Sequence, residues 1–410
     1  MALSIGDTVR LTVEKPAAGG EMLARADGQV VLVAGAIPGE QVVVRVERIA
    51  KRVAHATVME VGDASPDRRE AFADPRCGGC LYSHIAYRRQ LALKSEVIVD
   101  AFSRIAKITL PTLPVVTPSP EEGYRMRARL HMRGPRLGFF REGTHDICDA
   151  RQTRQLLPAT CDALDRLTAA ARSLGATELI REIELSENID GSERVAHFDS
   201  VQPLELRVLE ALAGIDGFTR GPHVTDTLSF GERRIVLRRH VLAFFQGNRH
   251  LLHRLVEHVV ERLPNGGSVL DLYAGAGLFA IAAAALRGAS VTAVEGDRYA
   301  ADDLHANAAA AGGPIEAKRA SVESFAASMK GADTVIVDPP RTGMTPPALD
   351  AVLRIRPRSL IYVSCDVATL ARDARAIVAR GYSLGLMQAF DLFPNTPHIE
   401  TVVEFEDLRI

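Results

Sequence analysis

One cysteine of the chain stands where a β-sheet would present a reactive side chain. Cys365 lies in residues 361–366, an apolar run typical of a buried strand that ends in a short turn. In α/β folds the ends of parallel strands carry the functional side chains. A free cysteine considered alone is more often a buried structural residue, because this residue type is among the most buried. The neighbouring motifs favour a nucleophile instead.

Two more predicted strands end in groups that suit chemistry. Residues 335–341 (VIVDPPR) end in Asp338 and two prolines, and residues 269–279 (VLDLYAGAGLF) open into a glycine-rich turn. Chains in which such strands alternate with helices form parallel sheets, whose strand ends meet at one edge. A glycine loop, an acid and a thiol therefore predict one active site.

The glycine-rich turn indicates a nucleotide-type cofactor. Gly275 and Gly277 let the backbone approach a ligand closely, and Glu295 ends the next strand about 20 residues on, where an acid binds ribose hydroxyls. The third glycine of a dinucleotide fingerprint is replaced by Ala280, which that fingerprint tolerates. The loop alone fits NAD or S-adenosylmethionine. The Asp-Pro-Pro-Arg motif favours S-adenosylmethionine, because a dehydrogenase has no use for it.

Composition sets the class of protein. The 410 residues suffice for two or three domains, and 47% hydrophobic and 24% charged residues are ordinary for a globular chain. Neither a membrane-spanning run nor a secretory signal is present, and nothing predicts an obligate protein partner. Five cysteines are too few for a disulfide scaffold, so we expect a reducing, cytoplasmic location.

Basic residues gather locally although the net charge is −2. Three segments, residues 45–55, 124–141 and 233–240, are rich in arginine. Arg125, Arg127 and Arg129 alternate along a predicted strand, so all three can face one side and contact a phosphate backbone. An ordinary solvated face explains any one segment equally well. The three together predict a nucleic-acid partner.

The elements that position these residues fall into three predicted domains. Residues 1–61 hold several short strands punctuated by turns, which predicts a small barrel of the oligonucleotide-binding kind. Residues 62–240 contain a linker with a CGGC motif and a mixed α+β central domain. Residues 241–410 alternate helix and strand, as in a doubly wound, Rossmann-like sheet. The predicted class is therefore α/β.

Further motifs, taken with those above, resemble the RNA uracil-5-methyltransferases, an S-adenosylmethionine-dependent family acting on rRNA or tRNA. The motifs that carry the resemblance are residues 19–21 and 37–40 of its RNA-binding TRAM domain, 124–130 and 137–139 of its central domain, 245–248, 363–366 with 369–373, and 391–400. The likeness covers nearly the whole chain. It implies methyl transfer to C5 of a uridine, with rRNA a better expectation than tRNA.

The resemblance also assigns roles to single residues. Cys365 matches the nucleophile and Glu400 the base. Independently of the resemblance, Phe244 or Phe245 is placed to stack on a flipped uridine, although either ring fits the core equally well, and the alternation predicts that Arg125, Arg127 and Arg129 contact RNA. The matched cofactor positions are Gln246, Tyr273, Gly275, Gly277, Glu295 and Asp338. Leu278 and Asp366 depart from the usual Asn. Because the chemistry needs a thiolate, we expect the surroundings of Cys365 to lower its pKa.

Many members of the family hold a [4Fe–4S] cluster on four cysteines. Cys77 and Cys80 match two of these positions, but Ala71 and Thr153 stand at the other two. Two thiolates cannot fill a four-thiolate site, and the spacing of Cys148 and Cys161 does not replace the missing pair. We therefore expect no cluster.

Two alternative functions differ in what they require. RNA cytosine-5 methylation needs a cysteine directly after a proline of the acid motif, where this chain has Arg341. An RNA-binding chaperone with a vestigial methyltransferase site would have no need for both Cys365 and Glu400. The residues therefore favour uridine methylation.

Overall fold

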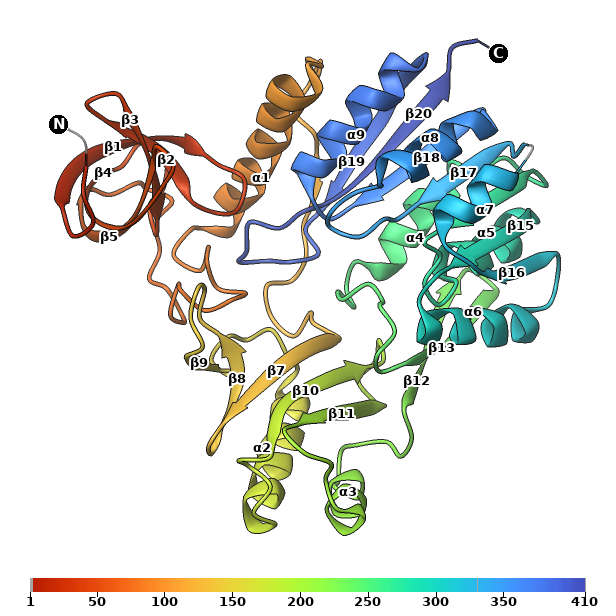
Figure 1. Ribbon diagram of the computed structural model, residues 1–410, viewed down its shortest axis with the longest axis horizontal. Coiled ribbons are helices and arrows are strands. Elements are labelled where there is room, and N and C mark those ends of the chain that lie inside the picture. Colours follow the sequence, from red (N-terminus) through yellow and green to blue (C-terminus); the bar gives the residue numbers. More distant parts are fainter. Residues whose placement is uncertain (1–2, 330, 410) are drawn as a thin grey trace.

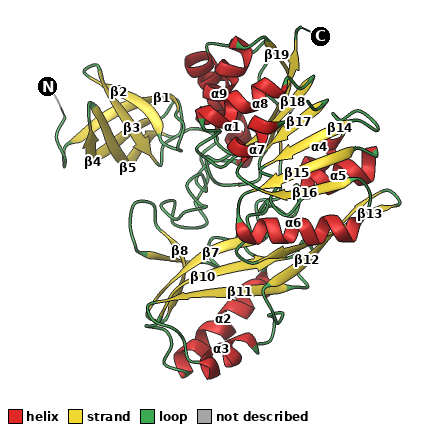
Figure 2. Cartoon of the chain, turned by 45° about the vertical axis from the view of Figure 1, so that its right-hand side comes forward, coloured by secondary structure: helices red, strands yellow, loops and turns green. Residues whose placement is uncertain are grey.

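The chain folds into three parts that surround a central junction (Figure 1). The computed structural model describes residues 3–329 and 331–409. A small barrel lies at one corner, a central sheet with two helices at another, and a large α/β domain at the third (Figures 1 and 2). No helix within these residues has the length and apolar character that crossing a bilayer demands.

The N-terminal barrel is closed, with strand order β1-β2-β3-β5-β4. Its strands are β1 Thr8–Pro16, β2 Met22–Ala26, β3 Gln29–Ala34, β4 Gln41–Ala50 and β5 Val53–Asp63. Alternate residues such as Val42, Val44 and Val46 are buried, because side chains of a strand point to opposite faces in turn. The closed barrel confirms the architecture predicted from the turn-punctuated strands.

The central part is a five-stranded sheet, in the order β11-β10-β7-β8-β9, with two helices on one side (Figure 2). Its elements are β7 Arg127–Arg133, β8 Arg136–Phe140, β9 Ile147–Asp149, α2 Pro158–Ser173, β10 Ile180–Glu187, β11 Arg194–Ser200 and α3 Leu206–Ala213. Ala128, Leu130 and Met132 of β7 pack into the core with α2 and α3. The alternating arginines of β7 consequently lie on the opposite face.

A two-stranded hairpin, β12 His223–Phe230 and β13 Arg233–His240, connects the central sheet to the large domain. The amide of Arg238 donates to Oδ1 of Asn307 over 2.9 Å, and the amide of His240 donates to Oδ2 of Asp303 over 2.5 Å. Both acceptors lie on α6 Arg298–Ala311. The third arginine-rich segment thus lies along a helix of the large domain.

The large domain is an eight-stranded sheet with helices on both faces (Figure 2), in the order β16-β15-β14-β17-β18-β20-β19-β6. Its remaining elements are α4 Leu252–Val260, β14 Ser268–Leu272, α5 Leu278–Arg287, β15 Ser290–Glu295, β16 Ile315–Arg319, α7 Val322–Ser328, β17 Thr334–Val337, α8 Pro346–Ile355, β18 Ser359–Ser364, α9 Val367–Ala379, β19 Tyr382–Phe390 and β20 Glu400–Asp407. Strands β14 to β18 pair in parallel, and β20 is antiparallel to both of its neighbours. This sheet confirms the doubly wound, Rossmann-like class.

One stretch of the predicted central domain belongs elsewhere. Helix α1 Tyr87–Ala101, continued by a π-helical turn at Phe102–Ala106, packs on α9, and β6 Val116–Thr117 forms the edge of the large sheet. Phe102 and Ala106 are buried in the same core as α9. These apolar contacts join residues 87–117 to the large domain, which corrects the grouping of residues 62–240 as one unit.

A buried ion pair holds α1 against the loop that precedes β20. Lys94 and Asp391 are 1% and 0% exposed, and Nζ of Lys94 contacts the carboxylate directly. Nζ also donates to the carbonyl of Phe393 over 3.0 Å, and the Tyr87 hydroxyl donates to Asp391 over 2.9 Å. A buried charge is tolerated only when it is paired and hydrogen-bonded, so this contact fixes the path of the loop.

The pair should therefore be sensitive to removal of one partner. We expect Asp391→Asn to lower the free energy of unfolding by about 3 kcal/mol, because Lys94 would stay buried without a counter-charge. Asp350→Asn is the control, since Asp350 and Arg380 form a surface pair whose loss changes stability by about 0.5 kcal/mol. Chemical denaturation of the three proteins makes the comparison. Equal losses in the two variants would contradict the structural role of the pair.

Candidate active site

The sheet topology brings Cys365 and Glu400 to neighbouring strands. Cys365 follows the last residue of β18, and Glu400 is the first residue of β20. In the antiparallel pairing of these strands, Ser364 lies opposite Thr401, so the two residues meet at the same edge of the sheet. Asp338 follows β17, the other neighbour of β18. The thiol and two carboxylates thus converge, as the motif order predicted.

The glycine-rich loop lies at the same edge, between β14 and α5. Tyr273 adopts a left-handed backbone with φ of 60°, and Gly277 a φ of 93° at the start of α5. A Cβ on Gly277 would lie 2.8 Å from Cδ1 of Leu304, so only glycine fits. The amide of Gly275 donates to Oε2 of Glu295 over 2.8 Å. The loop and the acid of the next strand therefore form one cradle.

Gln246 closes the cradle from the segment that enters the large domain. Its Nε2 donates to Oδ2 of Asp338 over 2.9 Å. The pKa of Asp338 is raised to about 7. Burial is the main cause and the charge of Glu295 adds to it, whereas the hydrogen bond from Gln246 opposes the shift. Asp338 and Gln246 beside the carboxylate of Glu295 fit S-adenosylmethionine, which needs hydrogen-bond acceptors and a negative environment for its sulfonium. The donor set therefore fits the cofactor that the sequence predicted.

The thiol is held in its protonated form in this structure. Burial, followed by the charges of Glu400 and Asp338, raises the pKa of Cys365 to about 12. The guanidinium of Arg341 opposes this shift by its charge and a hydrogen bond. The expectation of a lowered pKa is wrong, because burial and two carboxylates outweigh one arginine. Arg341 is the group that sequence reasoning missed, although it ends the Asp-Pro-Pro-Arg motif.

The Glu400 carboxyl is buried deeply enough to hold a proton. Its side chain is 2% exposed, and Oε1 has no hydrogen-bond partner within the described part of the chain. Burial and the charge of Asp338 raise the pKa of Glu400 well above its usual value, while Arg341 lowers it. A carboxylate that is costly to ionise is a strong base once it has lost its proton.

The two candidate stacking residues have different surroundings. Phe244 is 62% exposed, and the guanidinium of Arg127 lies 5.8 Å from the centre of its ring. Phe245 is 4% exposed and packs in the core under the guanidinium of Arg239, 4.7 Å away. Phe245 cannot stack on a base, which corrects its assignment as a substrate contact. Phe244 stays a candidate because most of its ring is exposed to solvent.

A small cavity lies between the arginine face of β7 and the loop before β20. Its volume is about 220 Å³. We call it the slot; its lining is Gly78, Gly79, Arg125, Arg129, His131, Phe139, Phe140, Arg341, Phe393, Thr396 and His398. His131 stacks on Phe140 with ring centres 3.5 Å apart, and Arg125 lies 5.3 Å from the Phe139 ring centre. Aromatic and arginine faces suit unpaired bases.

The three arginines predicted to contact RNA, Arg125 ahead of β7 and Arg127 and Arg129 within it, are engaged to different degrees. Nη1 of Arg125 donates to Gln155 over 2.6 Å, and Nε of Arg129 donates to Glu184 over 2.5 Å. Burial and then the charge of Arg239 lower the pKa of Arg127 to about 10, which leaves it cationic at neutral pH. All three lie on one face, as the alternation predicted, and Arg125 and Arg129 line the slot.

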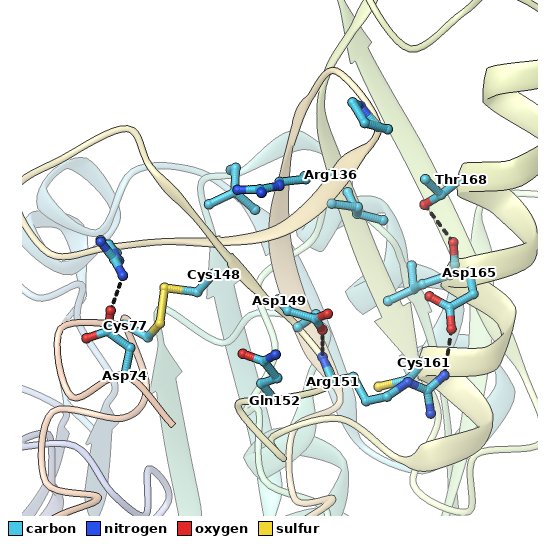
Figure 3. Close-up of a pocket in the computed structure, with 16 residues that line it drawn as sticks. Asp74, Cys77, Arg136, Cys148, Asp149, Arg151, Gln152, Cys161, Asp165 and Thr168 are labelled. Atoms are coloured by element: carbon cyan, nitrogen blue, oxygen red, sulfur yellow. Dashed lines mark hydrogen bonds and ion pairs between the residues drawn. A yellow bond between two sulfur atoms is a disulfide. The ribbon is translucent and has the colours of Figure 1, made fainter. Parts of the chain in front are cut away.

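The cysteines of the CGGC motif are arranged differently from the prediction. Cys77 forms a disulfide with Cys148, so it is not a free metal ligand (Figure 3). Cys80, Cys161 and Cys365 carry free thiols. In residues 3–329 and 331–409, no group of three or more His, Cys, Asp or Glu side chains is arranged to hold a metal ion. The assignment of Cys77 as a possible metal ligand is corrected by this bond.

Comparisons with known proteins agree with the fold. Residues 202–407 match the family profile described as tRNA (uracil-5-)-methyltransferase, and residues 3–59 match the TRAM domain. The 23S rRNA (uracil(1939)-C(5))-methyltransferase RlmD of Pseudomonas putida is 30% identical, over 98% of this chain and 94% of its own. The Halomonas elongata protein of the same name is 31% identical, over 93% and 85% of the two chains.

A solved structure matches the whole arrangement. The Pyrococcus abyssi tRNA (uracil-54, C5)-methyltransferase, in complex with S-adenosyl-L-homocysteine, has a TM-score of 0.75 and 26% identity, covering 96% of this chain and 99% of that one. The doubly wound domain with its glycine loop is that of an S-adenosylmethionine-dependent methyltransferase. The chain belongs to the tRNA (uracil-5-)-methyltransferase family and is an RNA uracil-5-methyltransferase.

The raised pKa of Glu400 predicts a pH-dependent effect on stability. The folded state holds the proton more tightly than the unfolded state, so the wild type loses stability as pH rises above the unfolded pKa. Glu400→Gln should raise the melting temperature of the large domain at pH 8 by about 2–4 °C, the shift for about 1 kcal/mol in a domain of roughly 150–250 residues. The difference should vanish near pH 4.

Glu406→Gln is the matched control, since Glu406 is exposed on the same strand. Melting curves of the three proteins between pH 4 and 8 measure the effect. A Glu400→Gln variant that is less stable than the wild type at pH 8 would contradict the burial argument.

Proposed function

We propose that this enzyme methylates C5 of a uridine in rRNA through a covalent bond between Cys365 and C6, with Glu400 as the base. The observation that carries the proposal is the pairing of β18 with β20, which puts the thiol and a buried carboxylate at one sheet edge. Asp338 and Gln246 adjoin them on the cofactor side. The proximity of these four side chains supports their assignment to one reaction.

The chemistry follows from the weak nucleophilicity of uracil C5. The Cys365 thiolate adds to C6, and the C5–C6 electron pair moves toward O4 to form an enolate. When bound, S-adenosylmethionine supplies an electrophilic methyl group to C5. Glu400 then takes the C5 proton, the C5–C6 double bond forms again, and the thiolate leaves. A base paired in a duplex is out of reach, so the uridine must be flipped out of its stack.

The protonation states assign a role to Arg341. The pKa values of Cys365 and Glu400 are both raised, so each group must give up its proton to solvent before it can act as nucleophile or base. The guanidinium of Arg341 is the nearby cation that favours both ionised forms. We infer that Arg341 supports the thiolate during attack and the carboxylate before proton removal. The same residue replaces the cysteine that cytosine-5 methylation would need.

The base assignment predicts that the reaction can be stopped at the adduct. Glu400→Gln should still form the Cys365–C6 bond and transfer the methyl group, but release product at least about 100-fold more slowly, the usual contribution of a general base. A covalent protein–RNA band should then appear on a denaturing gel. Normal turnover by Glu400→Gln would show that another group is the base.

Controls separate the nucleophile from the base. The double variant with Cys365→Ala should lose the band, because no thiol remains to bond C6. Cys365→Ala alone should lose turnover while its affinity for S-adenosylmethionine, measured by calorimetry, stays within about twofold, since the thiol serves C6 and not the cofactor. Cys161→Ala should behave as the wild type, because Cys161 is buried in the central core.

The choice of rRNA rests on relatives. The Pseudomonas and Halomonas proteins are named for 23S rRNA and span nearly the whole chain, whereas the Pyrococcus protein is named for tRNA. Deleting the gene should remove one 5-methyluridine from 23S rRNA and leave tRNA unchanged. Mass-spectrometric mapping of both RNA pools makes the test. Loss of 5-methyluridine from tRNA alone would overturn the rRNA assignment.

A further inference from the structure

The residues at the family's cluster position do not fit an iron–sulfur cluster. Sγ of Cys80 lies 3.9 Å from the carbonyl of Thr153, which stands where the sequence pattern predicts the fourth cysteine. The Thr153 hydroxyl is buried and donates to the Ala150 carbonyl over 2.7 Å, so it is not a free ligand. Cys148 enters from β9 and forms its bond with Cys77.

The remaining cysteine does not complete a four-thiolate set. Cys161 packs among the apolar residues of α2, whereas Cys77, Cys80 and Cys148 form a separate cluster with Phe72 and Ala73. Figure 3 shows Cys161 on the helix side of the cavity, with Asp149, Arg151 and Gln152 between it and the disulfide. A [4Fe–4S] cluster bound by cysteine needs four thiolates, whereas three cysteines, Cys77, Cys80 and Cys148, lie together here.

We propose that the Cys77–Cys148 disulfide is a reducible clamp that holds the slot in its RNA-binding shape. This inference rests on the proposed function, because it assigns a redox control to RNA binding beside the same active site. The bond joins positions 71 residues apart, and it ties the CGGC turn to the edge strand of the central sheet.

Backbone contacts carry the effect of the bond to the slot. Cys77 forms an isolated β-bridge with Arg141, and the amide of Gly78 donates to the Phe140 carbonyl over 3.1 Å. The disulfide and these backbone contacts thus hold the CGGC turn against β8, with Phe139 and Phe140, and against β9. Gly78, Gly79 and these two phenylalanines are walls of the slot.

The CGGC turn has little freedom as long as the bond is closed. Gly79 has a φ of 96°, and a Cβ there would lie 2.3 Å from Nε2 of Gln155. That same Gln155 accepts a hydrogen bond from Arg125, which also lines the slot. Movement of the turn would therefore displace an arginine of the RNA-binding face. Opening the disulfide removes the covalent restraint on this movement.

A reductant can reach the bond from a second cavity. This cavity has a volume of about 460 Å³, and its lining includes Cys77, Cys148, Cys161, Arg136 and Arg141 (Figure 3). The two free thiols near the bond are poor attackers, because burial raises the pKa of Cys80 to about 12 and that of Cys161 to about 11. Exchange within the protein is therefore slow, and opening depends on an external thiol.

The redox step balances with a dithiol as the reductant. Its thiolate attacks one sulfur of the bond and releases the other cysteine as a thiol, and its second thiol then resolves the mixed disulfide. The products are two protein thiols and one oxidised dithiol. Where thiols are kept reduced, disulfides are rare, and those that do occur are usually transient or redox-sensing. The reducing compartment predicted from the sequence would make this bond responsive.

A thiol count tests whether the clamp exists. Protein purified without reductant and labelled under denaturing conditions should show three free thiols, and five after treatment with dithiothreitol. Peptide mapping should find Cys77 linked to Cys148. Iron and acid-labile sulfide should be absent after anaerobic purification. Five free thiols before reduction, or about four irons per chain that are lost in Cys77→Ala, would overturn the clamp.

RNA binding tests what the clamp does. A fluorescent 12-nucleotide RNA of mixed sequence should bind the oxidised wild type at least about fivefold more tightly than the reduced wild type, the low end of coupling between two sites. Amide exchange in residues 136–149 should quicken on reduction. S-adenosylmethionine affinity should stay equal in both forms. Equal RNA affinity in both forms would mean that the disulfide has only a structural role, and it would overturn the proposal.

Matched variants exclude general unfolding. Cys148→Ser should bind RNA as the reduced wild type does and ignore dithiothreitol, whereas Cys161→Ser, in the same cavity, should respond as the wild type does. If Cys148→Ser does not fold, the comparison of oxidised and reduced wild type still shows whether the disulfide controls RNA affinity. If RNA affinity changes on reduction but the protein transfers no methyl group, the proposed function alone is contradicted. If the protein transfers a methyl group but its RNA affinity does not change on reduction, the clamp alone is contradicted.

Discussion

The reversal of β20 relative to the parallel strands is the constraint on which the active site depends. Parallel strands of the sheet end at one edge, where the cofactor loop, Asp338 and Cys365 lie. Only an antiparallel strand can begin at that edge, and β20 begins there with Glu400. The loop that leads into it is held by Lys94 through Asp391 and the Phe393 carbonyl. A helix near the N-terminal barrel therefore helps to position Glu400.

Crowding of acids around the thiol gives the site its electrostatic character. Burial is the largest cause of the raised pKa values of Cys365, Glu400 and Asp338. Neighbouring charges add to it: Glu400 and Asp338 raise the pKa of Cys365, Asp338 raises that of Glu400, and Glu295 raises that of Asp338. Such an arrangement lowers the stability of the folded protein near neutral pH, which is the usual consequence of building a reactive site. It also favours the protonated thiol. Arg341 is the cation that opposes these shifts at both Cys365 and Glu400.

The central domain positions the cofactor side of the site through a second buried charge cluster. Glu187, at the end of β10, accepts hydrogen bonds from Arg194 and Arg249, and Nη1 of Arg249 donates to the Ile189 carbonyl over 2.8 Å. Arg249 follows the segment of Phe244 and Gln246 by a few residues. A buried charge network of this kind favours one geometry, because the loss of one partner leaves a charge unpaired. The central sheet and the segment that carries Gln246 are consequently fixed to each other.

The sequence by itself determined whatever depends on local pattern. Alternation in residues 124–130 predicted that Arg125, Arg127 and Arg129 share a face, and strand-end motifs placed Cys365, Asp338 and Glu295 at one site. These features follow from the two-residue period of a strand and from the rule that strand ends carry function. Identical neighbours such as Phe244 and Phe245, however, have the same local pattern. Only packing against Arg239 decided which of the two rings is buried.

Tertiary structure alone decided the properties that depend on distant groups. The pKa of Cys365 rises because burial and the carboxylate of Glu400, 35 positions along the chain, outweigh Arg341, and no local motif expresses that balance. The pairing of Cys77 with Cys148 joins segments 71 residues apart, and the position of α1 on α9 joins parts of the chain even more distant. The local sequence encodes the direction in which a side chain points from a strand and the period with which the two faces alternate. Burial, charge and covalent pairing arise from non-local contacts, which exist only once the chain has folded.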